Sequence, residues 1–383
     1  MIKKVHIQNF KSIYDLEFEV GRINLFIGEN GSGKSNLLEA LVFVAASNAN
    51  KLDNEFLTSR GIRVTIPNLM RSAFDEESQD KPILIDISHG DDEYIETKLI
   101  NSASSYSTWE KVGVNQESKE RAVAELKTLS ETRLKDLEDS LRKLKKEDLL
   151  KLVKALDTVS NYPQFKDFII FSPENTALRN FYKEGQIEPL GINGEGLLKL
   201  LKVVNNYEDK SYINTIIKSL QLFNWFEDIN IPDNLSLSED KIIITDKYLY
   251  QNIDQRSANE GFLFILFYIT LIVAKETPKV FAIDNIDASL NPKLCTKLMT
   301  LIAELAKKYD KQIFLTTHNP AILDGIDLND ESQKLFIVSR NKSGYTRLKN
   351  ITIKDKPRSS DDEPLNLSEA FLRGYLGGLP KGF

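Results

Sequence analysis

Cysteine and histidine are scarce in this sequence. One Cys, Cys295, and three His occur among 383 residues. A single Cys cannot form an intrachain disulfide and is typical of a reducing compartment, so we expect a cytoplasmic protein with Cys295 as an ordinary buried helix residue. The same scarcity gives no basis for a metal site built from His and Cys side chains.

Long hydrophobic runs and a basic excess are also missing. The opening MIKKVHIQNF lacks the apolar run of a secretory signal. The most apolar stretch, residues 262–274, is shorter than the roughly 20 residues that span a bilayer, so we expect a buried helix there and no membrane association. The formal net charge is −6, so DNA could be a partner only through a local basic patch.

Enough apolar sequence is present for a sizeable core, since 41% of the residues are hydrophobic and 28% are charged. Apolar runs predict strands at 3–10, 16–20, 22–28, 82–88, 93–100, 168–172, 279–285 and 311–319, and a strand pair at 236–246. A helix between the strands at 279–285 and 311–319 predicts a parallel sheet.

A charged insertion is predicted in the middle of the chain. Residues 119–159 are rich in Lys, Glu and Leu and contain no Gly or Pro. Leu134, Leu137, Leu141 and Leu144 repeat at 3-4-3 spacing, which indicates a helical hairpin or short coiled coil; an amphipathic helix packed on the body is the alternative. We therefore divide the chain into an N-terminal lobe (1–110), a helical insertion (111–160) and a C-terminal lobe (161–383).

A phosphate-binding loop is predicted at INLFIGENGSGKSNLLEALVF, residues 23–43. Gly28, Gly33, Lys34 and Ser35 match GxxxxGK[ST], with an apolar strand before the motif and a helix after it. Lys34 would neutralise the β- and γ-phosphates of ATP, and Ser35 would ligate Mg²⁺. A Gly-rich turn that binds nothing would not need this strand–loop–helix context. The residues expected to bind ATP here are Gly28, Asn30, Gly31, Ser32, Gly33, Lys34, Ser35 and Asn36.

Five segments occur in an order that resembles the ABC-type ATPases of the SMC/RecF class, in particular small prokaryotic AAA-family ATPases related to RecF and OLD proteins. They are IQNFKSI, GENGSGKSNLLEAL, SANEGFLFIL, FAIDNIDASLNP and IFLTTHNPAIL. The resemblance implies an α/β fold, a P-loop ABC-type ATPase head with a mixed sheet and the helical insertion. It covers about the first 45 residues and residues 255–325.

The resemblance also implies roles for single residues. Lys11, in an NFKS turn formed by residues 9–12, would lie near the phosphates. Asp284 would be the Walker B acid that holds Mg²⁺ together with Ser35, and Asp287 the second acid of the family's DEPE pattern. Residues 289–291 would form the D-loop, and His318 the switch histidine that contacts the γ-phosphate. A purely structural histidine is the alternative for His318.

Two segments depart from the family pattern. Asn259 and Gly261, expected to bind the nucleotide, stand in a signature segment that reads Asn-Glu-Gly where the family has Ser-Gly-Gly or Ser-Glu/Asp-Gly. Ser257 and Glu260 predict a capping box and hence a helix start that could face a phosphate, or a helix cap and nothing more. A Q-loop glutamine cannot be placed. The basic stretch with Arg60, Arg63 and Arg71 could touch phosphate or a partner, but a solvated loop is favoured.

The residue after Asp284 is Asn285, where the family has a Glu that activates water. An amide cannot accept a proton, and a missing general base typically costs about 10²–10⁴-fold in rate. Asp287 or a partner subunit could supply the base, Asn285 could orient the water in a slow reaction, or ATP could act only as a structural switch. We favour slow hydrolysis, with Asp284, Asn285, Asp287 and His318 as the catalytic set.

One Walker A motif and one signature segment imply that two copies complete a site, so a homodimer or a higher even-numbered oligomer is expected. Two functions compete. The chain is the ATPase subunit of a phage-defence or genome-maintenance assembly whose effector is a separate protein, a nuclease as in Septu-like systems. Alternatively, it is a RecF-like clamp that uses ATP to dimerise on DNA.

Overall fold

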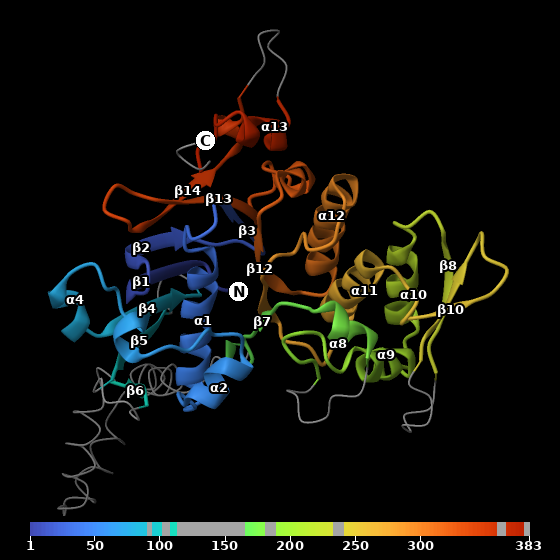
Figure 1. Cartoon of the computed structure of the whole chain (residues 1–383), viewed down its shortest axis with the longest axis horizontal. Coiled ribbons are helices and arrows are strands. Elements are labelled where there is room, and N and C mark those ends of the chain that lie inside the picture. The colour runs from blue at the N-terminus through green and yellow to red at the C-terminus, as the bar shows by residue number, and fades with distance from the viewer. Residues whose placement is uncertain are drawn as a thin grey trace, which may run out of the picture.

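The computed structural model describes residues 1–89, 94–101, 108–112, 165–180, 189–232, 241–357 and 365–378. The predicted insertion at 111–160, with its leucine seam, lies outside the described residues apart from its first two positions. Figure 1 shows a central sheet with the N-terminal strands and α1 on one side and α8–α12 on the other.

The central sheet has six strands in the order β14-β13-β3-β12-β11-β7. Five neighbouring strands are parallel to one another: β13, β3, β12, β11 and β7. The edge strand β14 pairs antiparallel with β13. The predicted parallel strands and the mixed character of the sheet are therefore confirmed. Their bounds are β3 (Ile23–Gly28), β7 (Ile170–Phe171), β11 (Val280–Ile283), β12 (Gln312–Thr317), β13 (Gln333–Arg340) and β14 (Thr346–Ile351).

Alternate side chains of the central strands enter two different cores. Leu25 and Ile27 of β3 pack with the helices of the C-terminal lobe, whereas Phe26 packs with α1 (Lys34–Asn48) and the N-terminal strands. Because a strand points successive side chains to opposite faces, a strand buried on both sides is mostly apolar. In β3, INLFIG, the exception is Asn24, whose buried side chain hydrogen-bonds to the backbone of Gly21.

Two antiparallel sheets flank the central one. The first has the order β2-β1-β4-β5-β6 and the second β10-β9-β8. Of the strand pair predicted at 236–246, residues 236–240 lie outside the described residues, and the second half contains β9, which pairs with both β8 and β10. The strands are β1 (Lys4–Phe10), β2 (Ile13–Glu19), β4 (Ile83–Ser88), β5 (Tyr94–Ile100), β6 (Glu110–Lys111), β8 (Phe226–Asn230), β9 (Ile243–Asp246) and β10 (Ile253–Asp254).

The predicted apolar helix is confirmed as α11 (Glu260–Val273), which is buried from Gly261 to its end. A helix that is hydrophobic on all sides must be surrounded by protein, and each large side chain it buries stabilises the fold by about 1.5–3 kcal/mol. Cys295 is fully buried on α12 (Pro292–Lys308), as predicted. Within the described part of the chain, no helix is long and apolar enough to span a bilayer.

The remaining described helices are short. They are α2 (Asn54–Ser59), α3 (Pro67–Met70), α4 (Glu76–Asp80), α8 (Asn175–Arg179), α9 (Leu197–Asn205), α10 (Ser211–Leu220) and α13 (Leu367–Leu372), with 3-10 turns at Pro320–Gly325 and Ile353–Asp355.

A buried lysine stabilises the connection from α11 to β11 by hydrogen bonds. Lys311 is 2% exposed, and its ammonium donates to the carbonyl oxygens of Ala274, Thr277 and Pro278 at 3.0–3.1 Å and to Thr277 Oγ1 at 2.8 Å. Burial, with a smaller contribution from Lys279, lowers the pKa of Lys311 to about 7. The side chain satisfies carbonyls at the end of α11 that would otherwise be buried without a donor.

Candidate nucleotide-binding site

The phosphate-loop motif forms the turn between β3 and α1. Gly31 and Gly33 have φ of +76° and +108°, a backbone that favours glycine. A Cβ at Gly28 would lie 2.0 Å from a backbone oxygen of β13, and one at Gly33 would lie 2.2 Å from a hydroxyl of β14. The packing of the loop against these two strands therefore requires glycine. Helix α1 begins at Lys34, so its free N–H groups face the turn.

Lys34 is held inside this loop. It is 5% exposed, and its ammonium donates to the carbonyl oxygens of Gly28 and Glu29 at 2.9 Å each and to His318 Nδ1 at 3.4 Å. Burial lowers the pKa of Lys34 to about 8, although Asp284 and other acids nearby oppose the shift. The ammonium is thus a desolvated positive charge, which interacts strongly with an anion.

The loop fits a phosphate group. Ser32 Oγ is buried without a hydrogen-bond partner among the described residues, and buried polar atoms are normally paired. Asn30 and Gly31 are exposed at the tip, and a Cβ at Gly31 would meet no atom within 4 Å. The loop therefore combines open space, a free hydroxyl and a cation, the donor set that a nucleotide phosphate needs.

Ser35 and Asp284 are brought together as predicted. Ser35 Oγ donates to Asp284 Oδ2 at 3.1 Å, and Thr316 Oγ1 donates to Asp284 Oδ1. The backbone N–H of Asp284 donates to the carbonyl oxygen of Phe171 at 2.8 Å, which fixes the carboxylate at the end of β11. A hydroxyl and a carboxylate are oxygen ligands of the kind Mg²⁺ takes. These two residues would hold Mg²⁺, which when bound would neutralise charge on phosphate oxygens.

Asp287 and His318 form a second pair beside Lys34. Asp287 Oδ1 accepts hydrogen bonds from Thr317 Oγ1 at 2.5 Å and from the backbone N–H of His318 at 3.3 Å. Partial burial, then the nearby Lys34 charge, lowers the pKa of His318, so its imidazole is neutral at pH 7. Asp287 therefore holds the backbone of His318, the predicted switch histidine, in position.

Asn285 has a backbone conformation that its side chain suits. Its φ is +56°, a left-handed value that Asn adopts more readily than most residues. Its N–H donates to Thr316 Oγ1 at 2.9 Å, and its side chain is exposed. A Glu here would carry a small backbone cost, which sequence reasoning did not include.

The Lys11 side chain forms an ion pair with an acidic residue and does not lie in the open phosphate loop. It has φ +49°, and its ammonium pairs with the Glu39 carboxylate on α1 and donates to Arg63 O at 3.1 Å. Arg63 Nε reaches the other Glu39 oxygen at 2.7 Å. Glu39 is 1% exposed, so its two cations compensate a buried charge. The pairing of Glu39 with Lys11 was not predicted, because nothing in the local sequence marks Glu39 as a partner of Lys11.

The predicted solvated loop of arginines is wrong. Arg71 is 4% exposed and donates to backbone oxygens of Lys81 and Asn101 at 3.1 and 2.9 Å. Arg60 donates to a backbone oxygen of Phe168 at 3.3 Å. Arg63 alone stays largely exposed, with 66% of its side chain accessible. Arg60 and Arg71 fix this loop on the body through backbone carbonyl oxygens, and Arg63 does so through the side chains of Glu39 and Asn36.

Three residues support the loop through hydrogen bonds that were not predicted. Asn36 Nδ2 donates to Ser12 Oγ at 2.7 Å, so Asn36 holds the NFKS turn against α1. Thr346 Oγ1 donates to the carbonyl oxygen of Ser32 at 3.0 Å, and Arg340 Nε to that of Gly31 at 2.7 Å. Thr346 and Arg340 lie more than 300 residues from the loop, a separation at which a single sequence gives no pairing signal.

The signature helix starts with a different cap from the one predicted. Asn259, not Ser257, is the N-cap, and its Oδ1 accepts from Phe262 N–H at 2.8 Å. Both Asn and Ser suit this position, and α11 begins one residue later, at Glu260. A Cβ on Gly261 would lie 3.1 Å from the carbonyl oxygen of Ser289. The signature and the D-loop therefore pack together.

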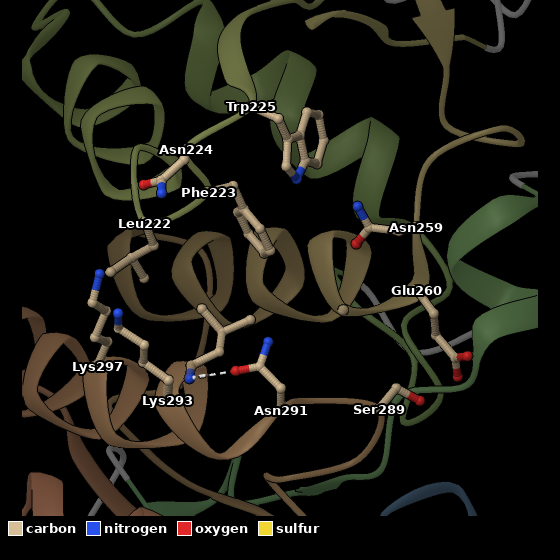
Figure 2. A pocket seen from close by; sticks show the side chains of 12 residues that line it. Leu222, Phe223, Asn224, Trp225, Asn259, Glu260, Ser289, Asn291, Lys293 and Lys297 are labelled. Carbon is tan, nitrogen blue, oxygen red and sulfur yellow. Dashed lines mark hydrogen bonds between the residues drawn. The ribbon is translucent and has the colours of Figure 1, made fainter. Parts of the chain in front are cut away.

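Asn259 and Gly261 line an open pocket of about 580 Å³ (Figure 2). Its other residues are Glu260 of α11 and residues of the turn at 222–225, of the D-loop and of the first turns of α12. None of the phosphate-loop residues, all of which the structure describes, lines this pocket. The two halves expected of a nucleotide site are thus separate places on one chain.

Comparisons with known proteins agree with this geometry. A family model described as "AAA domain, putative AbiEii toxin, Type IV TA system" matches residues 23–324. The DNA replication and repair protein RecF of Lactococcus lactis is 29% identical over 75 residues, 19% of this chain and 21% of that protein. The chain thus spans about a fifth of the length of these Lactococcus relatives.

A second relative and a solved structure cover more of the chain. The RecF protein of Clostridium botulinum is 24% identical over 277 residues, 68% of this chain and 70% of that protein. A crystal structure of an Smc head bound to the C-winged helix domain of ScpA covers 92% of this chain and 98% of that one, with a TM-score of 0.55 and 13% identity. The last match shows the fold alone and confirms the predicted P-loop ATPase head.

Proposed function

The chain belongs to the AAA-domain family whose model matches residues 23–324, and from this premise we propose that it binds ATP with Mg²⁺, self-associates on ATP and hydrolyses it slowly. In this proposal it is an SMC/RecF-like ATPase subunit that controls a separate effector protein, a nuclease, in phage defence or genome maintenance. We place it in the cytoplasm, without a membrane partner.

One observation supports the proposed self-association. The signature residues Asn259 and Gly261 line a pocket that includes no phosphate-loop residue. A nucleotide bound at Lys34 would therefore meet a signature segment only from a second copy. A two-fold dimer repeats the contact, since each copy offers its loop to the partner's signature. A homodimer or a higher even-numbered assembly satisfies this requirement.

The chemistry of the site supports slow turnover. Lys34 would neutralise the β- and γ-phosphates, Asp284 with Ser35 would orient the metal, and neutral His318 would hydrogen-bond a γ-phosphate oxygen. These electrostatic roles lower the barrier without a proton acceptor. Asn285 is exposed next to Asp284, where its amide can orient water but cannot take a proton. The rate is therefore limited by the missing general base.

The family's printed description, which refers to a putative toxin of a type IV toxin–antitoxin system, is compatible with a defence role and names no separate effector. The second candidate, a RecF-like clamp that dimerises on DNA, is favoured by the Clostridium botulinum RecF match over 68% of the chain. Duplex DNA that stimulates turnover and binds only with ATP would favour the clamp. Copurification of an effector without any DNA effect would favour the first candidate.

Complementation between two inactive variants tests the composite site. Lys34→Ala removes the phosphate cation, and Gly261→Glu places bulk and charge at the signature. Each variant alone should be inactive. An equal mixture should recover up to about half of wild-type turnover, because neither variant dimerises with itself and each mixed dimer holds one intact site of two. A mixture with no recovery, from variants that remain folded, would refute the composite site.

A further inference from the structure

The pocket at the signature segment has features that a nucleotide contact does not explain. We call it the signature pocket and define it by Asn259, Gly261, Ser289, the turn 222–225 and the first turns of α12. Figure 2 shows Phe223 and Trp225 along one side, and Lys293 and Lys297 at one end. Both lysines are exposed and have no hydrogen bond or ion pair to any described residue. The pocket thus combines apolar walls with free positive charge at the end formed by the lysines, whereas the carboxylate of Glu260 lies at the opposite end (Figure 2).

A complementary surface lies beside the phosphate loop. Ile66 and Leu69 are 63% and 57% exposed, whereas Met70, in the same short helix α3, is fully buried and anchors it. The carbonyl oxygen of Met70 accepts from the Lys11 N–H at 3.0 Å, which fixes α3 against the turn after β1. Two large apolar side chains are therefore presented to solvent on a fixed element.

Acidic residues follow this apolar pair directly. Asp75, Glu76, Glu77 and Asp80 are all exposed around α4. The one arginine in between, Arg71, is buried, 4% exposed, and bound to backbone carbonyls. The segment 66–80 thus offers apolar and negative groups, with Glu77 paired to Lys81 at 3.2 Å, and the end of the signature pocket at Lys293 and Lys297 offers positive groups.

We propose that the signature pocket of one copy receives the Ile66–Leu69 surface of a second copy. The proposal rests on the ATP-dependent self-association inferred above and names the contact that completes it. Arg63 Nη2 reaches Asn36 Oδ1 at 3.4 Å, so the loop that leads into α3 is adjacent to the first turn of α1. When one phosphate loop faces the partner's signature, α3 faces the partner's signature pocket.

This contact would add apolar burial to a dimer interface whose other attraction comes from the nucleotide phosphates and the backbone dipoles around them. Ile66 and Leu69 would leave water against Leu222, Phe223 and Trp225, and apolar burial is the main favourable term in association. Lys293 and Lys297 would face acidic residues of the partner, which favours this orientation and disfavours others. By two-fold symmetry the contact forms twice.

Paired substitutions test the contact through the mass of the assembly with a non-hydrolysable ATP analogue. Ile66→Ser with Leu69→Ser, and separately Lys293→Glu with Lys297→Glu, should each raise the dimer dissociation constant at least about tenfold. Tyr248→Ser with Tyr250→Ser is the matched control, because these side chains are 78% and 102% exposed but lie outside the pocket. Analogue binding to the Lys34 loop of the monomer, measured at protein concentrations below the dimer dissociation constant, should be unchanged in all variants.

Cysteine cross-linking gives a direct geometric test. Cys295 is buried, and burial raises its pKa to about 11, so introduced cysteines are the reactive ones. Leu69→Cys combined with Asn224→Cys should give covalent dimers with a short bis-maleimide only when the analogue is present. Leu69→Cys combined with Tyr250→Cys should not.

The outcomes separate this contact from the proposed function. A wild type that dimerises with the analogue, while the Leu69/Asn224 pair stays uncross-linked and the serine variants dimerise normally, would overturn the contact and leave self-association standing. A wild type that never dimerises would instead remove the proposed function itself.

Discussion

Ser35 Oγ lies 3.1 Å from Asp284 Oδ2, and this hydrogen bond joins the first turn of α1 to the end of β11 across 249 positions of sequence. Both oxygens are therefore in place before any cation binds. A preformed pair of this kind loses little conformational freedom when it takes a metal.

Asp284→Asn tests this pair. The amide keeps the shape but removes the negative charge, so ATP-analogue affinity should lose most of its dependence on Mg²⁺ while turnover falls by at least about 100-fold. Calorimetric titrations with and without Mg²⁺ measure the first effect. The exposed Asp310→Asn serves as the control, and a variant that keeps the full Mg²⁺ dependence would show that Asp284 is not a ligand.

Asn285→Glu should raise ATP turnover by at least about tenfold, because it supplies the general base that the site lacks. The φ of +56° at this position makes a non-Asn side chain somewhat unfavourable, so Asn285→Gln is the matched control. It carries a similar backbone cost without a base and should give no gain. A steady-state phosphate-release assay compares the three proteins.

Asp287→Asn tests whether this acid acts as the base instead. Asp287 Oδ1 already accepts hydrogen bonds from Thr317 Oγ1 and from the His318 N–H. We therefore expect the substitution to loosen the position of His318 rather than to remove a general base. Turnover that vanishes in Asp287→Asn while Asn285→Glu changes nothing would assign the base to Asp287.

ATP affinity should fall as the pH rises above about 8. Burial lowers the pKa of Lys34 to about 8 in the ligand-free protein, and bound phosphate must raise it because it stabilises the ammonium. The complex then holds more protons than the free protein near pH 8–9, so binding takes up a proton and weakens with increasing pH. Calorimetry in buffers of different ionisation enthalpy measures this uptake, and proton release would contradict it.

Lys311→Met should destabilise the fold by about 3 kcal/mol, because it leaves buried carbonyl oxygens of the α11–β11 connection without a donor. Chemical denaturation measures the loss against the exposed control Lys307→Met. The pKa of Lys311 is lowered to about 7 in the folded chain, so the unfolded chain binds more protons above that pH and wild-type stability should rise from pH 7 towards 10. Lys311→Met should lack this rise.

The parts of the fold that sequence predicted are those with local signals. The strand, glycine loop and helix around Lys34 are contiguous, and Asp284 and His318 each end an apolar strand of the parallel sheet. Because carboxyl ends of parallel strands meet at one edge, local patterns were enough to bring these residues together.

The parts that sequence missed depend on long-range pairing or on competing local signals. Lys11 pairs with Glu39, and Thr346 supports Ser32 across 314 positions; no local pattern marks such partners. At the signature, Ser257 and Asn259 are both good caps, and packing of Gly261 against Ser289 accompanies the choice of Asn259. The pairing of β9 with β8 was not predicted, because β8 is a short, half-polar strand.

The mass of the protein with and without a non-hydrolysable ATP analogue tests the central claim most directly, because it does not depend on turnover. Mass photometry should show a dimer or a larger even-numbered assembly with the analogue and Mg²⁺, and a shift to monomer without them. Lys34→Ala and Gly261→Glu should both stay monomeric. A wild type that remains monomeric at every analogue concentration, while calorimetry shows that the analogue is bound, would contradict an ATP site shared between two copies.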